Sequence, residues 1–210
     1  MNKTKVPTEI EKLLKKNNLG IKLDIGCGDA KQKGFVGMDI RALPGVDIVQ
    51  DIEMFPWPLP NESVSVAVAS HVLEHINPGR SDPKVTALID LLLKKKILKK
   101  EEIEKVIGNH NPGSIFMSFM DEVWRIMKTG GVFMISLPYG GSFGYWQDPT
   151  HCNGVNEATW AYFDPLHKSG LWNLYKPKPW RIENAAFQTN GFMEVALYKR
   201  RVDEKGNIYE

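Results

Sequence analysis

The stretch LDIGCGD, residues 23–29, decides the fold of this chain. Apolar and polar residues alternate over residues 21–25, which is typical of a short strand, and the strand runs directly into a turn with two glycines. Glycine lets a ligand approach the backbone closely. An acidic residue, Asp39, ends the next expected strand, residues 35–40. A carboxylate at that position can accept hydrogen bonds from both hydroxyls of a ribose. The stretch therefore predicts a ligand-binding turn on an α/β sheet.

Strands and helices alternate on both sides of this turn. The capping pair Thr8 and Glu11 predicts a helix over residues 9–16. Further strands are expected at residues 46–49, 63–70 and 132–137. Helices are expected over residues 84–107 and from Ser114 to the glycine pair at 130–131. Residues 140–153 are rich in glycine and read as a loop.

The end of the chain predicts an antiparallel hairpin. Residues 180–188 and 192–201 read as strands, and the Asn190-Gly191 pair between them favours a tight turn. The whole pattern predicts an α/β fold with a doubly wound, mostly parallel sheet and this antiparallel hairpin at its C-terminal end. We expect a single domain over residues 1–210, with a helical insertion at 84–108 and a lid or substrate region at 140–178.

The first crossover is unusually short. Only six residues separate Gly28 from Phe35, whereas a parallel crossover with a full helix needs about a dozen. The first crossover helix is therefore expected to be truncated or absent, and one face of the sheet is under-covered. The N-terminal helix, the insertion or a second copy of the chain in a homodimer could cover that face.

Composition excludes several classes of protein. Hydrophobic residues make up 42% of the 210 residues, too many for a disordered chain. With 27 basic and 25 acidic residues the net charge is +2, which gives no reason to expect binding to a membrane or nucleic acid through overall charge. The two cysteines fit a reducing compartment, and no segment reads as membrane-spanning or as a signal peptide. We expect a soluble, cytoplasmic protein.

The order of these elements and their motifs resemble the class I S-adenosylmethionine-dependent methyltransferases. The motifs are LDIGCG at residues 23–28, the acidic Asp39, VLEHI at residues 72–76 and the K-x-G-G turn at residues 128–131. The resemblance covers about residues 21–138 and the final hairpin. It implies S-adenosylmethionine as the cofactor and transfer of its methyl group to an oxygen, nitrogen or carbon nucleophile.

The resemblance also implies cofactor-binding residues at the ends of the strands: Asp24, Gly26, Gly28, Asp39, Asp51, Ile52, His71 and Val72. The two glycines would lie under the methionine portion, which Asp24 would contact or orient. Asp39 would hold the ribose, and Asp51 would accept from the adenine amino group. The last two residues would border the sulfonium.

His151 is the candidate catalytic residue. It lies in the polar loop 147–153, which aromatic residues flank in the sequence. There it could act as a general base or orient an acceptor hydroxyl or amine. A histidine packed against aromatic rings or bonded to loop backbone is the alternative. We expect a small-molecule acceptor first, and a protein or nucleic-acid acceptor second.

Three other functions stay open. The segment HVLEH, residues 71–75, matches the inverted zinc-protease motif, but a strand precedes it and Pro78 soon follows it. We therefore expect no metal and favour a zinc protease least. A nicotinamide-dependent oxidoreductase usually has three glycines and an acid about 20 residues on, whereas Asp39 comes 13 residues after Gly26. A non-catalytic S-adenosylmethionine-binding protein is the third alternative.

Overall fold

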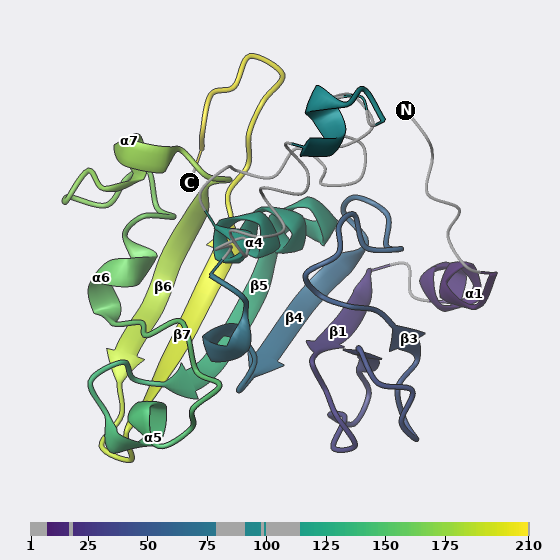
Figure 1. Ribbon diagram of the computed structural model, residues 1–210, viewed down its shortest axis with the longest axis horizontal. Helices are drawn as coiled ribbons and strands as arrows, with labels where there is room; N and C mark the ends of the chain where they lie inside the picture. Colours follow the sequence, from purple (N-terminus) through teal and green to yellow (C-terminus); the bar gives the residue numbers. More distant parts are fainter. Residues whose placement is uncertain (1–7, 17–18, 79–90, 98, 100–113, 210) are drawn as a thin grey trace.

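The computed structural model describes residues 8–16, 19–78, 91–97, 99 and 114–209. Its centre is a seven-stranded sheet with the order β3-β2-β1-β4-β5-β7-β6 (Figure 1). The strands are β1 (Ile21–Ile25), β2 (Val36–Asp39), β3 (Ile48–Val49), β4 (Val64–Ser70), β5 (Met127–Pro138), β6 (Trp180–Phe187) and β7 (Phe192–Lys199). Strands β1 to β5 are parallel, and β7 is antiparallel to both of its neighbours. This confirms the predicted mostly parallel sheet with an antiparallel C-terminal hairpin.

Short helices surround the sheet. They are α1 (Thr8–Lys16), the 3-10 turn η1 (Leu73–His75), α4 (Ile115–Ile126), α5 (Phe143–Trp146), α6 (Glu157–Trp160) and α7 (Trp172–Tyr175). Figure 1 shows α4 lying across the sheet in front of β4 and β5. Its Phe119 packs 6.3 Å, between ring centroids, from Phe133 of β5, and both rings are buried. None of the helices in the described parts of the chain is both long and apolar enough to cross a bilayer.

The short first crossover is as the sequence predicts. Residues 26–35 form turns and irregular segments between β1 and β2, with no helix. Strand order still proceeds in both directions from β1, toward β2 on one side and β4 on the other. The sheet is unevenly covered: on β5, Phe133 and Ile135 are buried, whereas Met134 on the opposite face is 41% exposed.

The end of α4 differs from the prediction. The glycine pair at 130–131 does not end the helix, because α4 stops at Ile126 and Met127 is already extended. The register of β4 against β5 then jumps from Val64 opposite Met127 to Val66 opposite Val132. The glycines lie in the resulting bulge, where a Cβ on Gly131 would be 2.9 Å from two backbone oxygens. Gly130 and Gly131 therefore allow the bulge in β5 and do not terminate α4.

The predicted loop at 140–153 and the predicted insertion at 84–108 complete the comparison with the sequence. The loop at 140–153 contains α5, which Ser142 caps by accepting a hydrogen bond from the N–H of Tyr145. Most of the predicted insertion at 84–108 lies outside the described residues. Within the part that is described, residues 91–94 are helical.

Candidate functional site

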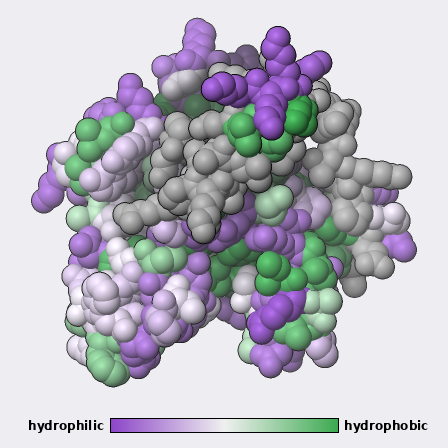
Figure 2. All heavy atoms as spheres, viewed as in Figure 1, coloured by the Kyte–Doolittle hydropathy of each residue, from purple (hydrophilic) through white to green (hydrophobic). Residues whose placement is uncertain are grey.

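The carboxyl ends of β1 to β4 meet at one edge of the sheet, where parallel α/β sheets place ligands. A cavity of about 360 Å³ opens there, within the usual range for small-molecule sites. The residues that line it are Gly26, Asp39, Ile40, Asp51, Ile52, Glu53, His75 and Ile76. Figure 2 shows the surface notched along this lower edge, between the loop that carries α5 and the loops that follow β1 and β2.

The glycine turn after β1 is a close-packed corner. Gly26 has a φ of +67°, and its N–H donates to the carbonyl of Met38 at 2.7 Å. A Cβ at this position would lie 2.5 Å from Cγ2 of Val72, so only glycine fits. The corner therefore brings the end of β1, the end of β2 and the segment after β4 together beneath the cavity.

Asp39 is held at the tip of β2 by three hydrogen bonds. Its Oδ2 accepts from the N–H of Gly28 at 2.8 Å, and its Oδ1 accepts from the N–H of Arg41 at 2.9 Å and from Arg41 Nε at 3.2 Å. Burial raises the pKa of the Asp39 carboxyl, but these donors and the Arg41 charge outweigh it and hold that pKa below its usual value. The lowered pKa of Asp39 thus favours a negative charge at the wall of the cavity.

The far wall of the cavity comes from the loop after β3. Asp51 Oδ1 accepts from the N–H of Glu53 at 2.9 Å, which folds the loop back on itself. Glu53 Oε1 then accepts from the N–H of Asn77 at 2.7 Å and ties this loop to the segment after β4. Ile40, 61% exposed, and the half-buried Ile52 add apolar surface beside the carboxylates.

The structure brings four of the eight predicted cofactor-binding residues to the cavity wall: Gly26, Asp39, Asp51 and Ile52. The others support it from behind or lie beside it. Asp24 accepts from the N–H of Gln32 at 2.7 Å, and burial raises the pKa of its carboxyl against that bond and Lys31. Gly28 orients Asp39, and Val72 packs on the glycine corner.

His71, the remaining predicted residue, lies at a strained point after β4. Its φ of +56° is unusual for a residue with a side chain, and its N–H donates to the carbonyl of Ser136 at 2.9 Å. Its Nδ1 lies 3.3 Å from Oε1 of Glu74. His71 therefore faces Glu74 and is not part of the lining of the 360 Å³ cavity.

His151 lies beside the segment after β4, although it comes 76 positions after His75 in the sequence. Its side chain is 6% exposed, and its Nδ1 donates to the carbonyl of Tyr145 at 2.7 Å. Its ring lies 5.4 Å from that of Tyr145 and 4.6 Å from that of His75. Its Nε2 lies 4.0 Å from Oε1 of Glu74 and 3.8 Å from Oδ2 of Asp148. One ring nitrogen is therefore bonded to loop backbone, and the other faces two carboxylates.

The sequence reasoning missed several residues of this edge. Ile40 and Glu53 are cavity residues that adjoin the predicted Asp39 and Ile52. Their position next to a predicted residue was the available signal. Glu74 and His75 belong to the VLEHI and HVLEH motifs, but neither was among the predicted site residues. Their importance follows from burial and contacts, which a motif does not show.

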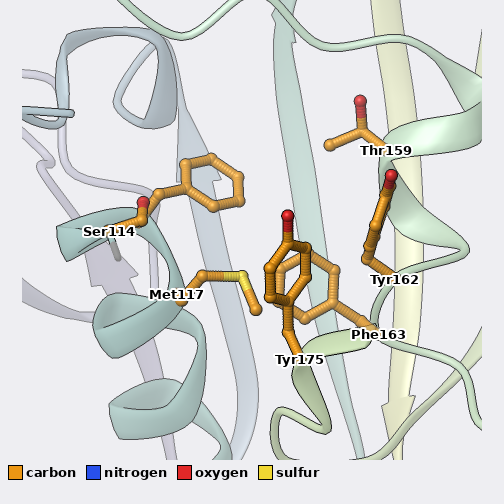
Figure 3. Close-up of a pocket in the computed structure, with 7 residues that line it drawn as sticks. Ser114, Met117, Thr159, Tyr162, Phe163 and Tyr175 are labelled. Carbon is orange, nitrogen blue, oxygen red and sulfur yellow. The ribbon is translucent and has the colours of Figure 1, made fainter. Parts of the chain in front are cut away.

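Two further cavities lie in the predicted lid and substrate region. One, of about 460 Å³, is lined by Tyr139, Gly140, Gly141, Tyr145, Trp146, Gly154, Val155 and Asn156, and so adjoins His151 through Tyr145. The other, of about 320 Å³, lies between α4, α6 and α7. Figure 3 shows Met117 of α4 and Tyr175 of α7 converging on it. Its aromatic lining shares no residue with the cavity at the glycine turn.

Comparison with known proteins identifies the fold. No model of a known protein family matches the chain, and no curated protein matches it either. Among solved structures, a mutant of the 16S rRNA (adenine(1408)-N(1))-methyltransferase from Catenulisporales acidiphilia matches 95% of this chain over 92% of its own, with a TM-score of 0.50 and 12% identity.

Two other solved structures are similar over most of the chain. The SAM-dependent methyltransferase from Aquifex aeolicus matches 90% of this chain over 88% of its own, with a TM-score of 0.46 and 14% identity. The one from Archaeoglobus fulgidus matches 90% over 94%, with a TM-score of 0.47 and 14% identity. The sheet of this chain, with its antiparallel C-terminal pair, is the α/β fold of the S-adenosylmethionine-dependent methyltransferases.

Proposed function

We propose that the chain is an S-adenosylmethionine-dependent methyltransferase that methylates an oxygen, nitrogen or carbon nucleophile of a small molecule. The observation that carries the proposal is the cavity at the carboxyl edge of the sheet, where Gly26, Asp39 and Asp51 come together. The fold agrees with it. The cofactor supplies an already activated methyl group on a sulfonium, so the protein's task is to bind, orient and exclude water.

The residues present fit such a cofactor. Oδ1 of Asp39 already accepts two hydrogen bonds, whereas Oδ2 accepts one and keeps a lone pair with which it can accept from a ribose hydroxyl. Asp51 can accept from an adenine amino group, and Ile40 and Ile52 offer apolar surface to the base. The turn at Gly26 has no side chain, so the methionine portion can lie against its backbone.

The acceptor side of the site would be the 460 Å³ cavity beside Tyr145. His151 is our candidate for the group that handles the acceptor, because it touches the lining residue Tyr145 and its Nε2 is not bonded to backbone. A cavity of this size favours a small molecule over a macromolecule. A nucleic-acid acceptor is the second candidate, since the rRNA methyltransferase shares the fold.

Calorimetry on the purified chain tests cofactor binding. S-adenosylmethionine or its demethylated product should bind with a stoichiometry of one, and NAD should give no heat. Binding of NAD without binding of S-adenosylmethionine would overturn the proposal in favour of an oxidoreductase. Transfer of a labelled methyl group to any member of a metabolite pool then separates an enzyme from a non-catalytic binding protein.

The variant His151→Ala tests the acceptor role. It should leave S-adenosylmethionine affinity unchanged and lower methyl transfer by about 10²–10⁴, the usual range for a positioned acid or base. His167→Ala is the matched control, because His167 is a half-buried loop histidine whose side chain, among the described residues, is hydrogen-bonded to Ser169 alone. Equal loss of cofactor affinity and turnover in His151→Ala would place His151 in the cofactor site instead.

A further inference from the structure

Three side chains beside the cavity form a cluster of metal-binding type. One nitrogen of His75, one nitrogen of His151 and one carboxylate oxygen of Glu74 all lie within 4.8 Å of one another. Glu74 and His75 belong to the η1 turn after β4, and His151 to the loop after α5. The cluster is therefore made by the fold and not by neighbours in the sequence alone.

Glu74 is the unusual member of the cluster. Its side chain is 0% exposed, and neither carboxylate oxygen has a hydrogen-bond partner among the described residues. Nδ1 of His71 lies 3.3 Å from Oε1 but does not meet hydrogen-bond geometry. A buried carboxylate without hydrogen bonds is costly, so it calls for a cation or a donor that satisfies it.

The backbone holds Glu74 in this position. Its carbonyl accepts from the N–H groups of Cys152 at 2.8 Å and Asn153 at 3.2 Å. The side-chain amide of Asn153 donates to the carbonyls of Leu73 and Ile76 on either side of it. The loop with His151 is thus fastened to the η1 turn, and the distance between Glu74 and His151 is built into the fold.

Both histidines have one ring nitrogen already engaged. Nδ1 of His151 faces the carbonyl of Tyr145, which can only accept, so this nitrogen carries the proton. Nδ1 of His75 lies 3.0 Å from the hydroxyl of Thr150, whose own proton goes to Asp148. His75 must therefore donate through Nδ1 as well. With the proton on Nδ1, Nε2 is the ring nitrogen that each histidine would offer to a metal.

We propose that Glu74, His75 and His151 bind a divalent transition metal of the Zn²⁺ type. Two imidazoles and one carboxylate are the protein ligands of several catalytic zinc and iron sites, and they leave open positions on the metal. His75 is exposed and lines the 360 Å³ cavity, so the site has an entry path from solvent. The sequence alone argues against a metal because a third ligand is missing from the motif. His151 supplies that ligand from across the fold.

The site changes the role open to His151. A nitrogen that ligates a metal cannot also take a proton from the acceptor, so His151 would act through the metal. An open position on that metal could orient the acceptor oxygen or nitrogen beside the cofactor cavity. This consequence rests on the proposed methyltransferase function, whereas metal binding itself does not.

Metal titration of the full chain tests the proposal. The purified protein is stripped with a chelator, titrated with Zn²⁺ by calorimetry and, in parallel, with Co²⁺ by absorption spectroscopy. We expect one ion per chain and a Co²⁺ spectrum without a thiolate charge-transfer band, because the cluster holds no sulfur. Absence of stoichiometric binding, or a thiolate band that assigns the ion to Cys27 or Cys152, overturns the proposal.

The variant His75→Ala should weaken Zn²⁺ binding at least about 100-fold, whereas His167→Ala should leave it unchanged. His75 is exposed, so its removal should preserve the fold, which circular dichroism checks. Equal affinity in the two variants overturns the proposal. As a second measure, Zn²⁺ should raise the melting temperature of the wild type and not that of Glu74→Gln. S-adenosylmethionine binding, measured on the same samples, separates failure of this site from failure of the proposed function.

Discussion

Two buried carboxylates at the same edge of the sheet have opposite surroundings. Asp39 at the tip of β2 is 5% exposed and accepts three hydrogen bonds, whereas Glu74 after β4 is 0% exposed and accepts none from the described residues. Asp39 is satisfied without a ligand and retains one further lone pair, on Oδ2. Glu74 is incomplete without one. The comparison teaches that the two carboxylates can bind ligands in different ways. The hydrogen-bonded carboxylate is already fixed in position, whereas the carboxylate without hydrogen bonds gains its first partner when a ligand binds.

The largest expected effect is at the complete carboxylate. Asp39→Ala should weaken S-adenosylmethionine binding by about 1.5–3 kcal/mol, the order of a hydrogen bond to a charged group. It should also lower the free energy of unfolding, because the N–H groups of Gly28 and Arg41 lose their acceptor. Calorimetry and chemical denaturation measure the two effects.

Asp47→Ala is the matched control for that variant. Asp47 also accepts from a backbone N–H, that of Gly37 at 2.7 Å, and from Lys31, but it does not line the cavity. Asp47→Ala should therefore lower stability and leave cofactor affinity unchanged. Equal loss of affinity in both variants would contradict the role of Asp39.

Substitution of Glu74, the carboxylate without hydrogen bonds, should change the free energy of unfolding in the opposite direction. In metal-free protein, Glu74→Met should raise the free energy of unfolding by about 1–3 kcal/mol, because it removes a buried polar group without partners. The control is Glu122→Met, since buried Glu122 accepts from the N–H of Trp57 at 2.6 Å and pairs with Arg125. Glu122→Met should destabilise. Destabilisation of the same size in Glu74→Met would show that Glu74 is satisfied.

The acid limb of the stability curve sharpens the comparison. The pKa of Asp39 lies below its ordinary value in the folded chain, because its hydrogen bonds outweigh burial. Its contribution to stability is therefore complete above the ordinary value of 3.8 and is lost as the pH falls through the lower folded pKa. Chemical denaturation at a series of pH values from neutral down to the folded pKa measures the free energy of unfolding. That free energy should fall less steeply with falling pH for Asp39→Asn than for the wild type. Identical slopes would contradict the shift.

The smallest expected effect tests the support behind the metal cluster. Thr150→Val removes the acceptor of His75 Nδ1–H and should lower Zn²⁺ affinity about tenfold, as loss of an outer hydrogen bond does at other metal sites. Thr150 is exposed, so the melting temperature of the metal-free chain should hardly change. Unchanged Zn²⁺ affinity would contradict a role of Thr150 in orienting His75 at the metal site.

Local patterns predict much of the fold and only part of the site. The sheet and its hairpin follow from signals between residues close in sequence. These signals are the alternation of apolar and polar residues over β1 and β4 and the Asn190-Gly191 turn. The end of α4 does not, because the bulge in β5 between Met127 and Val132 is set by the pairing of β5 with β4. The contact of His151 with Glu74 joins residues 77 positions apart and depends on how the loop after α5 is fastened. A contact between residues so far apart leaves no repeating pattern in the sequence from which it could be predicted.

The helix-free first crossover bears on which nucleotides this edge can accept. Pyrophosphate groups bind at helix N-termini, where free N–H groups and the helix dipole attract negative charge. Residues 26–35 provide no such terminus, and the cavity wall carries the carboxylates of Asp39, Asp51 and Glu53. Phosphate would be repelled there, whereas the positive sulfonium of S-adenosylmethionine would be drawn in. If the proposed function holds, the absence of a helix N-terminus at residues 26–35 and the three carboxylates together would favour S-adenosylmethionine over dinucleotides and ATP.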